Sequence, residues 1–153
     1  MYILGISAYY HDSAACLIKE NEIIAAVQEE RFTRIKHDSK FPKNSILFCL
    51  KEASIDITDV SFIAFYDKPF LKFERLIETY LAFAPNGFSS FYRSIPTWVK
   101  DKIFQKSTII NELQNLSSKK HNFEEKLIFS EHHLSHAASA FYPSPFEEAV
   151  VLT

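Results

Sequence analysis

Residues 1–28 read MYILGISAYYHDSAACLIKENEIIAAVQ, and this stretch decides the fold. Three short runs within it, at 2–7, 14–19 and 23–28, are rich in apolar or β-branched residues, and each is bounded by polar residues. The polar connection at 20–22 is short enough for a tight turn. The sequence therefore predicts a three-stranded β-meander at the N-terminus.

Outward from this meander, strand patterns alternate with helix patterns. The expected elements, in chain order, are a helix beginning near Pro42, a strand at 61–65, a helix at 70–84, a helical stretch at 98–116, a strand at 126–129, a helix capped by Ser130 that runs to about residue 141, and a buried strand at 148–153. This alternation predicts an α/β protein.

The composition bounds the class of protein. A chain of 153 residues with 47% hydrophobic residues is long enough for one domain with its own core. The net charge of −2 argues against a surface that coats nucleic acid. Only Gly5 and Gly87 are glycines, so glycine-rich phosphate loops of the Walker or Rossmann kind are excluded.

The cellular compartment is also constrained by the sequence. No apolar run approaches the 18 residues that a membrane span requires. The start lacks a positive segment and meets His11 and Asp12 too early for a signal peptide. Cys16 and Cys49 lie among apolar neighbours, which is typical of buried, reduced thiols. We therefore expect a cytoplasmic protein without membrane partners.

The sharpest candidate site is the run SEHHLSH at 130–136. His132 and His136 stand four residues apart, so on a helix their rings lie one turn apart on the same face. This spacing lets a helix offer two imidazole nitrogens to one divalent metal ion, iron(II) or zinc. Position 133 is His rather than Glu, which disfavours metalloprotease chemistry. The alternative interpretation is a polar helix start with surface histidines.

A second candidate is the polar connection at 9–13, between two expected strands. His11 is able to take a proton from a hydroxyl near neutral pH, and Asp12 is able to orient its imidazole. The alternative is a turn that is polar because it is exposed. In the charged run at 29–37, Arg31, Arg34 and Lys36 are candidates to contact phosphate or carboxylate. The favoured interpretation of that run is a solvated edge with local ion pairs.

Four stretches together carry a resemblance to a known family. They are GISAYYHDSAACLI (5–18), AAVQEERFTRIKHD (25–38), FYDKPFLKFERLIETYL (65–81) and FSEHHLSHAASAFYPSPFEEAVVLT (129–153). In order and without large gaps, they resemble the O-carbamoyltransferases of nodulation-factor and antibiotic decoration. The likeness extends over essentially the whole chain.

The resemblance implies an actin-like or sugar-kinase (ribonuclease H-like) fold, similar to the domain used in threonylcarbamoyl-adenosine synthesis. Residues 1–153 would form its first lobe, with a helical insertion at about 70–118. The chain would stop before the second lobe and the carbamoyl-activating domain. We therefore expect a fragment that depends on the remainder of its own polypeptide.

The resemblance also implies a reaction in two steps. Carbamoyl phosphate and ATP first give a carbamoyl-adenylate, and the carbamoyl group then passes to a hydroxyl of a small sugar-like or antibiotic-like acceptor. His11 would contact that hydroxyl, and the substrate or nucleotide would be bound by Tyr10, Asp12, Ser13 and Arg31. His132 and His136, with an aspartate further along the polypeptide, would hold iron(II), or alternatively zinc.

Two other functions remain open at this point. One is a transfer-RNA-modifying module of the threonylcarbamoyl type, which the acidic balance and the lack of a basic stripe disfavour. The other is a non-catalytic assembly lobe of the actin-like fold, which would need no metal. A small hydroxylated molecule is the expected partner, and nucleic acid is not.

Overall fold

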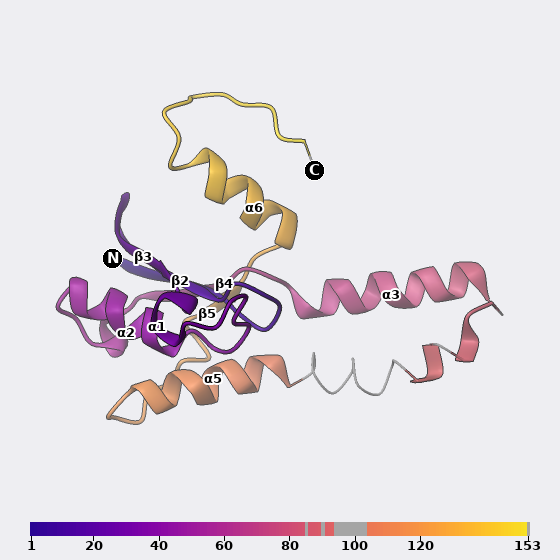
Figure 1. The fold of residues 1–153 in the computed structure, drawn as a ribbon, viewed down its shortest axis with the longest axis horizontal. Coiled ribbons are helices and arrows are strands. Elements are labelled where there is room, and N and C mark those ends of the chain that lie inside the picture. The colour runs from indigo at the N-terminus through magenta and orange to yellow at the C-terminus, as the bar shows by residue number, and fades with distance from the viewer. Residues whose placement is uncertain (85, 90, 94–103, 153) are drawn as a thin grey trace.

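A five-stranded mixed sheet forms the centre of the molecule, in a computed structural model that describes residues 1–84, 86–89, 91–93 and 104–152 (Figure 1). The strands lie in the order β3-β2-β1-β4-β5. Their bounds are β1 Tyr2–Ser7, β2 Ala14–Lys19, β3 Glu22–Gln28, β4 Phe62–Phe65 and β5 Leu127–Phe129. The helices are α1 Glu30–Thr33, α2 Lys43–Glu52, the 3-10 turn η1 Ile57–Asp59, α3 Pro69–Phe83, α5 Gln105–Leu116 and α6 His132–Phe141. The predicted α/β class and N-terminal meander are confirmed.

Two kinds of strand pairing build the sheet. The meander β1-β2-β3 is antiparallel, whereas β1 pairs with β4, and β4 with β5, in parallel. Parallel neighbours need a crossover connection, and helical segments supply it here. Because β1, β4 and β5 run in the same direction, their carboxyl ends meet at one edge of the sheet.

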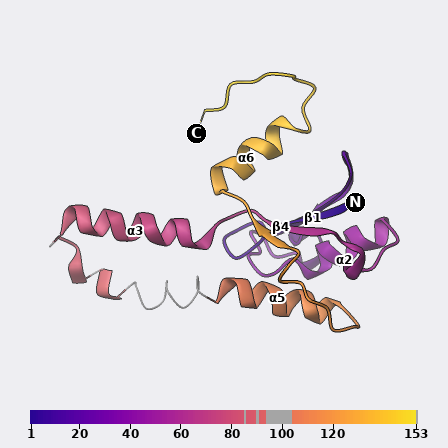
Figure 2. The same ribbon diagram turned by 180° about the vertical axis from the view of Figure 1, so that it is seen from behind.

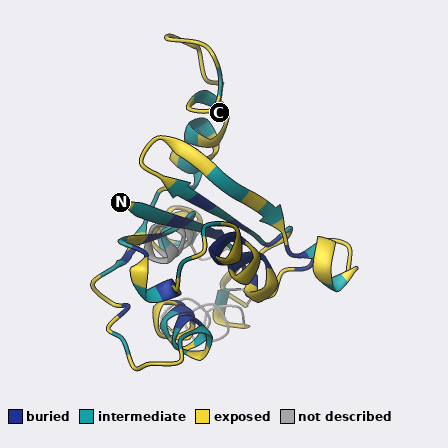
Figure 3. Ribbon diagram, turned by 90° about the vertical axis from the view of Figure 1, so that its left-hand side faces the viewer, coloured by how far each residue is buried: buried dark blue, intermediate teal, exposed yellow. Residues whose placement is uncertain are grey.

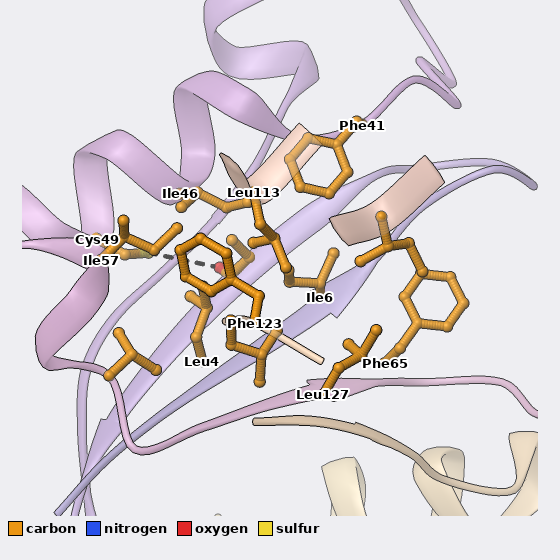
Figure 4. Close-up of a cluster of buried hydrophobic side chains, with 14 of the residues drawn as sticks. Leu4, Ile6, Phe41, Ile46, Cys49, Ile57, Phe65, Leu113, Phe123 and Leu127 are labelled. Carbon is orange, nitrogen blue, oxygen red and sulfur yellow. Dashed lines mark hydrogen bonds between the residues drawn. The ribbon is translucent and has the colours of Figure 1, made fainter. Parts of the chain in front are cut away.

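The core lies on one face of this sheet. Strand register aligns Leu17, Leu4, Ile63 and Leu127 in one row across four strands, and all four side chains are buried. The alternation of side chains along a strand places this row on a single face. Helices α2 and α5 cover it with a second set of buried side chains, which comprises Ile46, Cys49, Leu50, Ile109 and Leu113 (Figure 4).

The layers are visible in the ribbon views. Helices α2 and α5 lie on one side of the sheet and α6 on the other, while α3 projects away from the sheet (Figures 1 and 2). Buried residues concentrate between the strands and α2 (Figure 3). On the opposite sheet face, large side chains such as Phe62 and Ile128 remain exposed. In the described part of the chain, none of the helices has the length and apolar character that crossing a membrane requires.

Glu29, which follows β3, joins the meander to α2. Its side chain is buried at 2% exposure and accepts four hydrogen bonds. Oε1 accepts from Asn44 N (3.0 Å) and Nδ2 (2.7 Å), and Oε2 accepts from Ser45 N (2.8 Å) and Oγ (2.6 Å). The residue before α2 is Pro42, which makes no side-chain cap. Glu29 therefore caps α2 from fifteen residues away, with a negative charge at the positive end of the helix.

Several expectations need correction. The solvated edge predicted at 29–37 is wrong at Glu29, because the start of α2 needs a buried acceptor. Ser130 does not cap α6: its N–H donates to Phe65 O (2.9 Å) and continues the strand ladder, and Glu131 stands at the N-cap without a side-chain hydrogen bond to the helix backbone.

The strand predicted at 148–153 is also wrong for residues 148–152, and residue 153 lies outside the described residues. Val150 is 90% and Leu152 is 94% exposed. An extended segment becomes a strand only when a neighbouring strand satisfies its backbone groups. This segment lies beyond α6, away from the sheet (Figure 1).

Two further expectations agree with the described residues. The helix expected at 98–116 is confirmed from Gln105 to Leu116, and its first part falls largely outside the described residues. Cys49 is buried and Cys16 half-buried, and neither forms a disulfide. Desolvation by burial raises the pKa of the Cys49 thiol to about 11 and also raises that of Cys16. Both cysteines are therefore held as protonated thiols.

Replacing Glu29 with Gln is expected to destabilise the protein by about 2 kcal/mol. An amide NH₂ in place of one oxygen leaves a buried donor of Asn44 or Ser45 without its acceptor. Urea denaturation of the wild-type chain and of Glu29→Gln measures the difference in the free energy of unfolding. Glu22→Gln, the same chemical change at an exposed strand end, serves as the control. Equal stability of the two variants would contradict the role assigned to Glu29.

Candidate active site at the carboxyl edge of the sheet

Three loops meet at the carboxyl ends of the parallel strands. Residues 8–13 follow β1, residues 66–68 follow β4, and residues 130–131 lead from β5 into α6. In open α/β sheets, ligands bind outside this edge. The predicted site residues at 10–13, and His132 and His136, all lie in these loops or in α6, which begins there (Figure 1).

Backbone hydrogen bonds hold the first loop against the segment that follows α1. Tyr9 N donates to Ser39 O (2.8 Å), and Ser13 N donates to Asp38 O (2.8 Å). Ser13 O in turn accepts from the N–H of Glu29 (2.8 Å), the residue that caps α2. The loop between β1 and β2 is thus hydrogen-bonded near both of its ends to the segment that follows β3.

Asp12 binds two histidines with its two carboxylate oxygens. Oδ2 lies 2.8 Å from His11 Nδ1, and Oδ1 lies 2.9 Å from His37 Nδ1. The hydrogen bonds from His37 and then His11 lower the pKa of Asp12. An ionised carboxylate only accepts hydrogen bonds, so each ring presents Nδ1–H to Asp12. The Nε2 atom of each neutral ring is then a free lone-pair acceptor.

The backbone at this cluster is held in an uncommon conformation. Tyr9, Asp12 and His37 have φ angles of 69°, 50° and 57°, in the left-handed region. A non-glycine residue there costs about 1 kcal/mol or more and persists only when the surrounding structure enforces it. The loop-to-loop hydrogen bonds supply this constraint, so the aspartate and both histidines are positioned by the fold.

His132 and His136 face each other on α6, as the four-residue spacing predicts. Their Nε2 atoms lie 3.2 Å apart. Two nitrogens that each stand about 2.0–2.1 Å from one tetrahedral metal ion are about 3.3 Å apart. The pair therefore fits a shared divalent metal. In the part of the chain that the structure describes, no group of three or more His, Cys, Asp or Glu side chains gathers for a metal, so the pair has no third such side chain beside it there.

The carboxyl ends of β4 and β5 fix the start of α6. Ser135 Oγ donates to Tyr66 O (2.9 Å) or to Glu131 O (3.0 Å), and the first of these bonds spans 69 residues of sequence. Lys68 Nζ donates to Glu131 Oε1 (3.2 Å). Because Ser135 lies between the two histidines in sequence, its bond to Tyr66 fixes the rotation of α6 about its axis and with it the direction of the pair.

Tyr66, in the loop after β4, packs against His132. Its ring centroid is 5.5 Å from that of His132, and burial, with smaller contributions from Asp67 and Tyr10, raises its pKa to about 12. Tyr10 in turn lies with its ring centroid 4.5 Å from that of His11. One tyrosine ring thus packs beside His11 and another beside His132. Tyr66 stays a neutral phenol in this position.

The other predicted site residues differ in their placement. Tyr10 is exposed beside His11. Ser13 is buried at 1% exposure, and its hydroxyl has no hydrogen-bond partner in the part of the chain that the structure describes. Arg31 is exposed on α1, and no contact among the described residues brings its side chain to His11 or Asp12. The binding roles of these three residues stay predictions.

Two residues of this edge were missed from the sequence, namely His37 as a partner of Asp12 and Glu29 as the anchor. The predicted meander could have indicated that both residues lie near the loop at 8–13. In an antiparallel hairpin, the residue before β2 and the residue after β3 stand at the same edge, so the chain that leaves β3 must pass the loop at 8–13.

The sequence is similar to several longer proteins. The chain is 56% identical over 151 residues to an uncharacterized protein of Synechocystis sp., sll1178, and covers 25% of its length. It is 34% identical over 148 residues to nodulation protein NolNO of Sinorhizobium fredii, and covers 20% of its length. An uncharacterized protein of Methanocaldococcus jannaschii, MJ1058, is 30% identical over 185 aligned positions, with 30% of its length covered.

The chain thus spans between a fifth and a third of the length of these relatives, although nearly all of its own residues align with them. The family described as Carbamoyltransferase N-terminus matches residues 2–153. This range contains the whole sheet, the Asp12 cluster and α6. The chain therefore belongs to the carbamoyltransferase N-terminus family.

Proposed function

We propose that this chain provides the acceptor-side site of an O-carbamoyltransferase, which moves a carbamoyl group from carbamoyl-adenylate to a hydroxyl of a small sugar-like or antibiotic-like molecule. Family membership supports the reaction class. The observation that carries the mechanism is the pair of contacts at Asp12, which leaves the Nε2 atom of His11 available as a base.

His11 acts as the general base in this proposal. Asp12 accepts its Nδ1–H, so the lone pair on Nε2 faces outward and takes the proton of the acceptor hydroxyl. The hydroxyl oxygen bonds to the carbamoyl carbon, the bond from that carbon to the adenylate oxygen breaks, and AMP leaves with the bonding electrons. The carboxylate of Asp12 stabilises the imidazolium that forms, as a buried aspartate does in hydrolytic triads.

His132 and His136 are the proposed metal ligands, with iron(II) favoured over zinc. A bound metal supplies Lewis-acid stabilisation of phosphate or carbonyl oxygens. The helix supplies both ligands from one face and Ser135 fixes their direction. In the described structure, one Nε2 is placed to donate a hydrogen bond to the other, so that ring would carry its proton on Nδ1 instead if both Nε2 atoms held a metal.

The relatives' greater length supports a division of labour. Because the chain covers 20–30% of their lengths, we propose that the activating step, which uses ATP and carbamoyl phosphate, is performed elsewhere in such a polypeptide. The chain described here would then receive the carbamoyl-adenylate at its carboxyl edge. The hydroxylated acceptor is its small-molecule partner.

The variant His11→Asn tests the proposed base. An asparagine amide reproduces the hydrogen bond to Asp12 but offers no basic nitrogen, so the rate of transfer is expected to fall about 10²- to 10⁴-fold. The assay uses the full-length protein with ATP present. It measures the transfer of a labelled carbamoyl group from carbamoyl phosphate to amino sugars and their oligosaccharides. His133→Asn, an exposed histidine on α6, is the control. Undiminished transfer by His11→Asn would remove His11 from the mechanism.

Metal binding tests the second part of the proposal. Calorimetric titration of the chain with iron(II) without oxygen, and separately with zinc, is expected to show one weak site, because two neutral imidazoles are an incomplete ligand set. The variants His132→Ala and His136→Ala should each abolish it. His133→Ala, one residue along the same helix, should leave it intact. Binding that survives His136→Ala, or disappears with His133→Ala, would refute the assigned pair.

A further inference from the structure

We propose that the far end of α3 and the turn that follows it bind a second copy of this chain, in a two-fold symmetric contact between aromatic side chains. This inference goes beyond the proposed function and does not depend on it, because α3 begins near the carboxyl edge of the sheet and ends away from it. The binding surface, called the α3 tip below, consists of four side chains: Leu81, Phe83, Phe88 and Tyr92.

The α3 tip is strongly exposed. Its four large apolar side chains fall within residues 81–92, and each of them is between 66% and 73% exposed. Helix α3 projects away from the sheet, which places its far end at the outside of the molecule (Figures 1 and 2). A single exposed apolar side chain is ordinary on a protein surface, but a concentration of them marks a surface that binds a partner.

The turn after α3 is held in place by contacts with the helix. Asn86 N donates to Phe83 O (2.9 Å), and Phe91 N donates to Gly87 O (3.0 Å). Gly87 has a φ angle of 80°, which other residues rarely adopt, and a Cβ there would lie 3.5 Å from the ring of Tyr80. The rings of Tyr80 and Phe91 pack with their centroids 4.2 Å apart. These contacts fold the turn back on α3 and leave the α3 tip facing outward.

Two rings of the α3 tip form a common surface. Phe88 and Tyr92 stack with their centroids 6.3 Å apart and their planes 29° apart. Stacked rings hold each other in one orientation, so they lose little further freedom when a partner covers them. Aromatic residues are enriched at the centres of protein interfaces for this reason and for their large contact area.

The charge pattern around the α3 tip favours a second copy as the partner. No Asp, Glu, Lys or Arg occurs from Thr79 to Tyr92. Exposed charged side chains border this run: Glu74, Arg75, Glu78 and Arg93. An uncharged aromatic centre with a charged rim is the pattern of a protein interface. A two-fold contact places the same surface on both sides, so the uncharged centres meet without like-charge repulsion, and the two acidic and two basic rim residues balance.

A lipid surface fits the α3 tip less well. Peripheral membrane sites combine exposed apolar residues with an excess of Lys and Arg, which attract anionic lipids. Here Glu74 and Glu78 offset the two basic residues that border the tip, and the whole chain has a net charge of −2. The observations therefore favour the second copy over a membrane.

Light scattering coupled to size-exclusion chromatography tests the proposal on the full-length protein and on the chain described here. Both are expected to have the mass of a dimer and to dissociate on dilution. Phe88→Asp places a charge against the second copy, so it should weaken self-association about 30-fold or more. Tyr142→Asp, at an exposed tyrosine that follows α6, is the control and should leave self-association unchanged.

A second variant separates loss of the contact from loss of the fold. Tyr92→Glu places a charge on the neighbouring ring position and should weaken self-association to a similar extent. Both substituted side chains are exposed, so circular dichroism and thermal unfolding of the two variants should match those of the wild type.

A full-length protein that is monomeric at every concentration would overturn the proposal, even if the shorter chain self-associates, because another part of the polypeptide would then cover the α3 tip. A dimer that survives both Phe88→Asp and Tyr92→Glu would overturn it as well. Cosedimentation of a monomer with vesicles of phosphatidylglycerol and phosphatidylcholine, lost in Phe88→Asp, would assign the tip to a membrane instead. Carbamoyl transfer is measured separately, so failure of the proposed function and failure of this contact are distinguishable.

Discussion

The buried carboxylate of Glu29 is the contact on which the rest of the structure depends. Its side chain caps α2, whose apolar face covers the sheet, and its backbone N–H donates to Ser13 at the start of β2. A charged group is expensive to bury unless hydrogen bonds compensate it, and four do so here. One residue therefore couples the packing of the core to the position of the loop that presents His11 and Asp12.

Strand direction determines where the chemistry is. The antiparallel meander brings the loop after β1 next to the segment after β3, which unites Asp12 with His37. The parallel strands β4 and β5 end at the same edge and deliver α6 with its paired histidines. Two groups of histidines from distant parts of the sequence thus share one edge, where Tyr66 packs against His132. Neither pairing pattern alone would produce this arrangement.

The sequence predicts what local patterns determine. The alternation in β1 and β2, and the spacing of His132 and His136, are properties of a few consecutive residues and need no information on distant contacts. Glu29 and His37 bind partners that are 15 and 25 residues away in sequence. Their roles therefore could not be predicted from the charged run at 29–37, which by composition alone indicates a solvated segment. The same limit explains the wrong strand at 148–152: its composition favours β structure, but a ladder partner is a property of the fold.

The two histidine groups differ in charge, and this difference suits a group-transfer site. Behind His11 stands an anion, Asp12, which lies 2.8 Å from Nδ1 and so leaves Nε2 as the nitrogen that faces an acceptor hydroxyl in the proposed function. Under the proposed function, the two histidines would hold a divalent metal with neutral imidazoles, which leave its positive charge uncancelled. That charge would attract the phosphate oxygens of a nucleotide. A metal and a nucleotide would then reinforce each other's binding, because each supplies the charge that the other lacks, while His11 would act from the loop after β1, which β4 separates from β5 in the sheet.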